Sequence, residues 1–168
     1  SAEIEKLSSF SASGGIDWKK VLQLAADISA TKSKDLLVFS YLCVALMKTE
    51  GLDGLATGVH IMRDLLETFW ESMFPAKARM RGRKNAVDWW VERVKAGLGD
   101  IGQQTWAAAK RDAFIDDLRT IDEFLGNNME DAPILSPMIS SINGLIEVEK
   151  EITAEEGAQP AGDAAMFF

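Results

Sequence analysis

The stretch from Leu36 to Met47 decides the fold class, and it reads Leu-Leu-Val-Phe-Ser-Tyr-Leu-Cys-Val-Ala-Leu-Met. A helix built from this run is apolar nearly all round, which is typical of the central helix of a bundle. It is too short to cross a membrane, because a membrane-spanning helix needs about 20 apolar residues. We therefore expect a helical bundle with this segment at its centre.

Helical spacing continues on both sides of this segment. Upstream, Asp17 is a suitable N-cap for a helix whose apolar residues recur at Trp18, Val21, Leu22, Ala25 and Ile28. Ser33 is expected to cap the central helix, with Asp35 in its first turn near the positive end of the helix dipole. Downstream, Gly51 and Gly54 are expected to break the chain before a third helix, which Pro75 ends because proline lacks the amide donor.

Three further helices are predicted, beginning near Asn85, near Gln104 and at Ser136. In the last of these, Ser136 is the expected cap and Pro137 the first helical residue. No run alternates with a period of two, so no strand is predicted. The expected fold class is all-α, a bundle of about six helices over residues 1–153. Residues 154–168 are rich in Ala, Gly, Glu and Pro, which predicts a flexible acidic tail; the role of Met166, Phe167 and Phe168 stays open.

The bulk composition excludes several classes of protein. The chain has 168 residues, 47% of them hydrophobic, which suits one domain with a sizeable core. A formal net charge of -8 argues against a general nucleic-acid binder, which needs an excess of Lys and Arg. The single cysteine, Cys43, excludes an internal disulfide and a multi-cysteine zinc site. We expect a cytoplasmic protein that does not insert into a membrane.

The residues needed for catalysis are missing from the sequence. His60 is the only histidine, and there is no nucleophile turn and no glycine-rich phosphate loop. A metal site on the helix face with His60, Asp64, Glu67 and Glu71 is the alternative to a solvated polar face. A di-iron bundle needs Glu-x-x-His on two helices, whereas Thr57 stands three residues before His60. The sequence favours a polar face with an i,i+4 pair between His60 and Asp64, and predicts no catalytic residue, cofactor or metal.

A basic segment follows Pro75. Residues 76–84 contain no acid and carry Lys77, Arg79, Arg81, Arg83 and Lys84. These cations could bind an anion, pair with acidic helix faces or contact an acidic partner, and the spacing does not separate these three options.

Two adjacent tryptophans follow the basic segment. Trp89 and Trp90 project about 100° apart on a helix, so they cannot both be fully buried through one face. The exposed one is a candidate contact residue. We predict a partner-binding surface at the end of the third helix and the basic segment, made by Arg79, Arg81, Arg83 and the exposed member of the pair Trp89 and Trp90.

A set of short motifs, taken in order, matches a known family. The matching residues are Asp17, Trp18, Lys34, Asp35, Leu36, Gly51, Gly54, Trp70, Pro75 and Asn85. On these residues, the sequence from about Glu3 to Val94 resembles the N-terminal domain of the TssA (ImpA-related) family of bacterial type VI secretion systems. The chain departs from the family at Leu37, where an arginine is frequent.

The resemblance implies a non-catalytic adaptor or docking domain. Members of the family help to assemble the baseplate and the tail tube and sheath, so the implied partners are baseplate, tail or membrane-complex subunits near the inner membrane. Nucleic acid is not an implied partner. A higher oligomer is expected only with the C-terminal region of the family, which this sequence lacks. The alternative function is a helical metal-binding or anion-binding regulatory domain.

Overall fold

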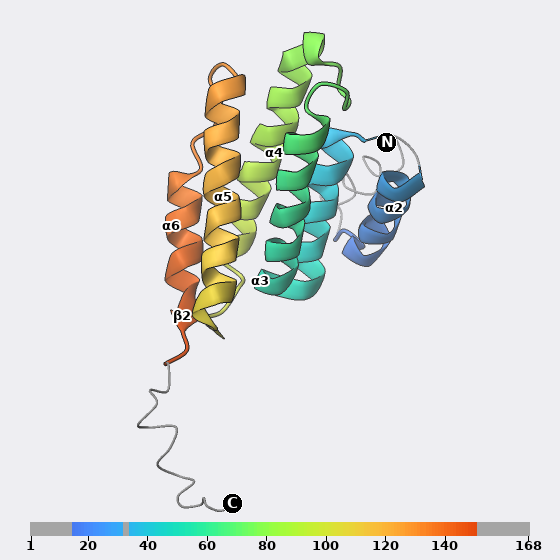
Figure 1. Ribbon diagram of the computed structural model, residues 1–168. Coiled ribbons are helices and arrows are strands. Elements are labelled where there is room, and N and C mark those ends of the chain that lie inside the picture. The colour runs from blue at the N-terminus through green and yellow to red at the C-terminus, as the bar shows by residue number, and fades with distance from the viewer. Residues whose placement is uncertain (1–14, 32–33, 151–168) are drawn as a thin grey trace, which may run out of the picture.

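The computed structural model describes residues 15–31 and 34–150, which form a mainly helical bundle (Figure 1). The fold class expected from the sequence is confirmed. The predicted tail at 154–168 and Met166, Phe167 and Phe168 lie outside the described residues. The helices are α2 (Trp18–Thr31), α3 (Leu36–Phe69), the short 3-10 helix η2 (Lys77–Arg79), α4 (Met80–Leu98), α5 (Ala108–Asn128) and α6 (Ser136–Leu145).

Helix α3 is a hairpin of two helical halves that meet at Gly51. The backbone of Gly51 has φ 66° and ψ -144°, a conformation that favours glycine. Gly54 lies inside the second half, so the prediction that it also breaks the chain is wrong. A Cβ atom at Gly54 would lie 2.0 Å from the carbonyl oxygen of Leu46. Gly54 is therefore needed for the close approach of the two halves.

The first half of α3 is buried on both sides, which confirms its predicted central position. One side, with Leu36, Phe39 and Cys43, belongs to the main core shared with α4, α5 and α6. The other side, with Val38, Tyr41 and Leu42, packs against Val21 and Ala25 of α2. Residues three and four apart share one side of a helix, so two apolar stripes account for a segment that is apolar nearly all round.

The residue that caps the start of α3 differs from the predicted one. Asp35 is the N-cap itself, because its carboxylate accepts hydrogen bonds from the amides of Leu37 at 2.9 Å and Val38 at 3.4 Å. The predicted cap, Ser33, lies outside the described residues. The end of α3 also differs, since the helix ends at Phe69 rather than at Pro75.

Helix α4 begins at Met80, so the prediction that it begins near Asn85 is wrong. Met, Arg and Lys are good helix formers, and they extend the helix back through most of the basic segment. Arg81, Arg83 and Lys84 therefore lie on a helix and not in a flexible linker.

A small parallel sheet closes one end of the bundle. Strand β1 (Gln104–Trp106) pairs with β2 (Ile146–Val148), with Gln104 opposite Ile146 and Trp106 opposite Val148. The prediction of no strand is wrong, because two three-residue strands far apart in the chain are too short to show a period of two.

The helices that flank this sheet start slightly away from their predicted positions. Helix α5 begins at Ala108 rather than near Gln104. Helix α6 begins at Ser136 with Leu135 in the cap position, so Ser136 is not the cap. The amide of Leu135 donates instead to the carboxylate of Asp122, at 3.0 Å.

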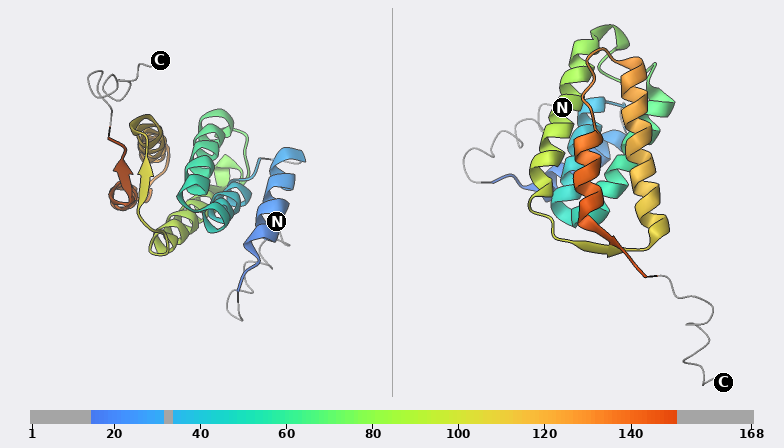
Figure 2. Two further views of the ribbon diagram at one scale, coloured as in Figure 1. Left: turned by 90° about the horizontal axis from the view of Figure 1, so that it is seen from below. Right: turned by 90° about the vertical axis from the view of Figure 1, so that its left-hand side faces the viewer.

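The chain runs up and down, so its connections gather at two ends. The turn between α3 and α4 and the connection between α5 and α6 lie at one end, and the sheet lies at the other (Figures 1 and 2). None of the described helices is long and apolar enough to span a membrane.

We expect Gly54→Ala to destabilise the domain by about 2–3 kcal/mol, because its methyl group would overlap the backbone of Leu46. Gly126→Ala is the matched control: Gly126 also lies in a helix, and a Cβ there meets nothing within 4 Å. The control is expected to keep or slightly raise stability, since alanine is the better helix former. Urea denaturation measures both, and equal stabilities would contradict the close approach.

Cys43 offers a second test of the core. Burial raises the pKa of its thiol to about 12, so the folded protein holds the unreactive thiol at pH 8. We expect labelling by a thiol reagent to occur only as fast as the domain unfolds. Because the folded-state pKa is raised, this group stabilises the fold fully below its unfolded pKa, and the stabilisation is lost as pH rises toward 12. Rapid labelling in the absence of denaturant would contradict this burial.

Candidate functional site

Arg83 organises the end of the bundle that carries the turn between α3 and α4. Its side chain is fully buried. Its guanidinium donates to three backbone carbonyls, those of Trp70 at 2.7 Å, Met73 at 2.9 Å and Pro75 at 2.7 Å. The prediction that Arg83 is a surface contact for a partner is therefore wrong.

The physical reason lies in the end of α3. Trp70 is the C-cap of α3, Met73 and Pro75 lie in the turn that follows, and buried carbonyls that stay unpaired are costly. Arginine presents five donors in a rigid fork, so one side chain can satisfy several carbonyls at once. The guanidinium also stacks over the ring of Trp70 at 4.6 Å. Burial lowers the pKa of Arg83, because loss of water disfavours the charged form.

The same turn is fastened to the beginning of α3. The amide of Leu36 donates to the carbonyl of Phe74 at 2.7 Å, and the amide of Phe74 donates to the carbonyl of Lys34 at 2.9 Å. Asp35 and Phe74 thus form an isolated parallel bridge. Motif residues that are far apart in the sequence meet at this one place.

We define the bundle-end surface as Lys34, Phe74, Lys77, Arg79 and Arg81. Phe74 is 53% exposed although its backbone is fixed on both sides. Lys77 pairs with Glu71 at 3.0 Å. Arg79 and Arg81 are exposed, and within the described residues their side chains have no ion-pair partner. Sequence reasoning missed Phe74, because nothing in the apolar stripe of α3 marks this residue as exposed.

Lys34 is held more firmly than the other cations of this surface. Its ammonium group donates to the carbonyl of Ser29 at 2.8 Å and lies 5.6 Å from the centre of the Phe69 ring. Lys34 therefore links the end of α2 to the two ends of α3.

The tryptophan pair is divided between core and surface. Trp90 is 1% exposed and belongs to the core, so it is not available to a partner. Trp89 is half-buried, meets Tyr41 edge-on at 4.5 Å and is covered by Arg93 at 5.4 Å. It lies about two turns along α4 from Arg81, so the structure does not bring Trp89 into the bundle-end surface.

Comparison with known proteins identifies the family. The model of the family described as "ImpA, N-terminal, type VI secretion system" matches residues 1–92. The chain belongs to this family.

Two individual proteins resemble the chain. The type VI secretion system component TssA1 of Pseudomonas aeruginosa is 37% identical over 59 residues, which are 35% of this chain and 17% of that protein. The matched stretch thus spans less than a fifth of the relative's length. A solved N-terminal domain, including the conserved ImpA_N region, of the TssA component of the type VI secretion system from Burkholderia cenocepacia has a TM-score of 0.71. It shares 18% identity over 86% of this chain and 81% of that chain, a likeness of fold.

The remaining motif residues of this ImpA N-terminal domain have mostly structural positions. Asp17 caps α2 through the amide of Lys20 at 3.2 Å, as predicted. Trp18 is half-buried and packs against both parts of the core. Asn85 is exposed on α4, and nothing in the structure explains its place in the motif.

Asp117 of α5 contacts the polar face that carries His60, and the sequence analysis did not predict this contact. Asp117 is buried, and its carboxylate oxygens lie 3.0 Å from His60 Nδ1 and 2.8 Å from Arg63 Nη1. The predicted pair of His60 and Asp64 is longer, at 3.7 Å. Asp117, followed by Glu67, raises the pKa of Arg63. Among the described residues no cluster of His, Cys, Asp and Glu could hold a metal ion.

We expect Arg83→Met to lower the free energy of unfolding by about 3 kcal/mol, because it leaves three carbonyls of the turn without a donor. Arg83→Lys should recover only part of this loss, since an ammonium group lacks the fork. Arg81→Met, an exposed change on the same helix, is the control and should alter stability by less than about 0.5 kcal/mol. Equal unfolding midpoints for Arg83→Met and Arg81→Met would disprove the role of Arg83.

Proposed function

We propose that this domain is a non-catalytic docking module of a TssA-like component, and that it binds other subunits of the type VI secretion apparatus through the bundle-end surface. The observation that carries the proposal is the exposure of Phe74 on a turn held by Arg83, Lys34 and Leu36. An aromatic side chain on a fixed backbone loses little conformational freedom on binding, which favours affinity.

The charge of the surface supports a particular kind of partner. The chain as a whole carries a net charge of -8, yet Arg79 and Arg81 follow Phe74 closely in the sequence, are exposed, and have no carboxylate partner among the described residues. Aromatic residues and arginines are the residue types that most often dominate the energy of protein interfaces. The best fit is a partner with an apolar pocket for Phe74 and acidic side chains at its rim.

Membership of the family supports the choice of partners. Baseplate, tail and membrane-complex subunits are the proposed partners, and the proposed place of action is the apparatus at the inner membrane. We also propose that the helical domain extends to about residue 153 and that residues 154–168 act as a linker. The proposed role in assembling the baseplate and the tail tube and sheath belongs to the longer protein of which such a domain is one part.

The test is a pairwise binding assay between the purified chain and the purified baseplate, sheath and membrane-complex subunits of the same genome. The triple variant Phe74→Ser, Arg79→Ser, Arg81→Ser should bind its partner at least about tenfold more weakly, because it removes the aromatic anchor and both exposed arginines. Its melting temperature should stay close to that of the unchanged chain, since exposed side chains contribute little to stability.

Lys95→Ser provides the matched control, because Lys95 is an exposed cation on α4 near the opposite end of the helix. This variant should bind as tightly as the unchanged chain. If the triple variant folds and binds with unchanged affinity, the bundle-end surface is not the docking site. If the unchanged chain binds none of these subunits, the docking function itself is rejected.

A further inference from the structure

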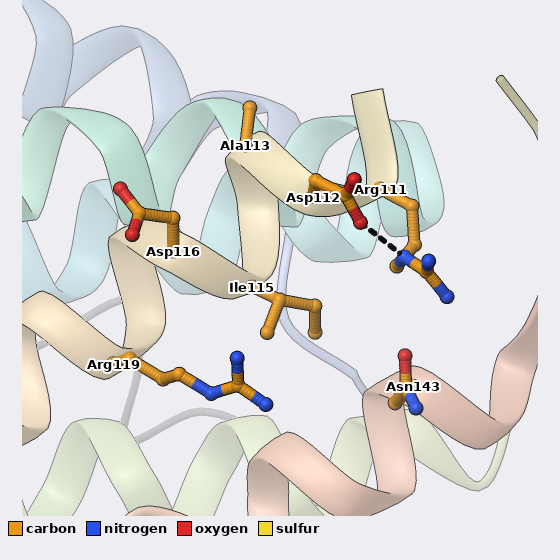
Figure 3. Close-up of a pocket in the computed structure, with 7 residues that line it drawn as sticks. All are labelled: Arg111, Asp112, Ala113, Ile115, Asp116, Arg119 and Asn143. Atoms are coloured by element: carbon orange, nitrogen blue, oxygen red, sulfur yellow. Dashed lines mark hydrogen bonds and ion pairs between the residues drawn. The ribbon is translucent and has the colours of Figure 1, made fainter. Parts of the chain in front are cut away.

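A cavity lies away from the bundle-end surface, between α5 and α6. It is an open cavity of about 660 Å³ (Figure 3). Six of its lining residues come from α5 and one, Asn143, from the last turns of α6. The α5 residues are Arg111, Asp112, Ala113, Ile115, Asp116 and Arg119.

The acidic residues of the lining are already engaged. Asp112 accepts a hydrogen bond from Arg111 Nε at 2.8 Å. Asp116 lies 3.4 Å from Nη1 of Arg63 on α3, and Figure 3 shows its carboxylate turned away from the cavity. Among the described residues Arg119 has no carboxylate partner, and the two terminal nitrogens of Arg111 remain available as donors.

Three side chains with hydrogen-bond donors border the cavity. Figure 3 shows the guanidinium groups of Arg111 and Arg119 and the amide of Asn143 directed into the same open space, with Ile115 between the two arginines. Within the part of the chain that the structure describes, the side chains of Arg119 and Asn143 have no hydrogen-bond or ion-pair partner. Such an arrangement leaves several donors for a ligand that brings acceptors.

An arginine without a partner is unexpected in this chain, which has 26 acidic and 18 basic residues. Arg63 pairs with Asp117, Arg83 binds three carbonyls and Arg93 covers Trp89. In the described residues, the arginines without a partner are Arg79 and Arg81 of the bundle-end surface and Arg119 of this cavity.

We infer that the cavity binds an acidic peptide segment of a partner protein, with one carboxylate on Arg111 and a second on Arg119. The inference rests on the proposed docking function and adds a second site to it. The arginines are eight residues apart on one helix, which separates their backbones by about 12 Å. In an extended peptide, two side chains four positions apart are separated by about 13 Å. Ile115 would contact the apolar side chain between them.

The spacing and the surroundings favour a peptide over other anions. The backbones of Arg111 and Arg119 are about 12 Å apart along α5, and each guanidinium can bind one carboxylate in a two-point fashion, so two separated carboxylates match the two arginines. A continuous polyanion such as a nucleic acid would also bring phosphates beside Asp112 and Asp116, whereas a peptide can place its two carboxylates at Arg111 and Arg119 and an apolar side chain between them.

The cavity and the bundle-end surface can be tested independently. Arg111 lies in the first turn of α5 and Asn143 near the end of α6, which places them toward the sheet end of the bundle, away from the turn between α3 and α4. A change at Phe74 should therefore leave the cavity intact, and a change at Arg119 should leave the bundle-end surface intact.

The experiment uses fluorescein-labelled peptides with two glutamates four positions apart and a leucine between them. Fluorescence polarisation at low ionic strength should show binding to the unchanged chain, with the tightest binding at this spacing when the separation is varied. Arg119→Gln should weaken binding at least about tenfold, equivalent to about 1.4 kcal/mol. Arg119→Lys should weaken it less, because lysine keeps the charge and loses the fork.

Three controls separate the explanations. Lys95→Gln, an exposed change on α4, and the triple variant of the bundle-end surface should both leave peptide binding unchanged. The matched peptide with glutamines should not bind. Inorganic phosphate and a single-stranded oligonucleotide should compete poorly with the diglutamate peptide.

Several results would overturn the inference. These are no binding, equal binding of the glutamine peptide, equal or better competition by phosphate or oligonucleotide, and unchanged binding by Arg119→Gln. Loss of peptide binding in the triple variant alone would place the peptide at the bundle-end surface, which rejects the cavity and keeps the proposed docking function.

Discussion

The burial of Arg83 is the constraint on which the rest of this domain depends. This arginine lies on α4 and binds the turn that follows α3. A charged side chain without a carboxylate partner is costly to bury, and Arg83 offsets that cost by donating to the carbonyls of Trp70, Met73 and Pro75 and by stacking on Trp70. The arrangement holds only while α4 is helical back to Met80, because that places Arg83 beneath the turn. The turn in turn fixes the start of α3, since Phe74 exchanges backbone hydrogen bonds with Lys34 and Leu36.

This constraint links the family motif to a surface. Asp35, Leu36, Trp70 and Pro75 are buried or engaged in the turn, so their common purpose is to set its shape. A turn of this shape leaves the ring of Phe74 exposed. In the proposed docking role, a side chain presented by a turn that the core holds on two sides needs little further ordering on binding, because folding has already fixed its backbone.

The elements that the sequence predicts well are those with a long repeat. The central helix at residues 36–47 and the stripe of α2 show helical spacing over many residues, and both lie in the core as predicted. The errors occur where the partner of a residue is distant in the chain. Arg83 stands in a basic run that is typical of a solvated segment, and only the three-dimensional turn supplies its carbonyls. Asp117 looks like any other acid of α5 until α3 brings His60 and Arg63 against it. The pairing of β1 with β2 was also not predicted, because the two strands are distant from each other in the chain.

The same long-range pairing explains why the net charge of the chain is a poor guide to what it binds. Several carboxylates of α3 and α5 form ion pairs between these two helices, such as Asp117 with Arg63 and Asp53 with Lys110. Among the arginines of the described residues, those left without a carboxylate partner lie at two separate places: Arg79 and Arg81 near the start of α4, and Arg119 on α5 near Ile115. Both places lie on helices packed against one core, so their separation is fixed. A partner that reached both would bind the second site at a high effective concentration, whereas a partner matched to only one would not. If both proposed sites act together, their rigid spacing gives selectivity for a single partner even though each site alone is modest.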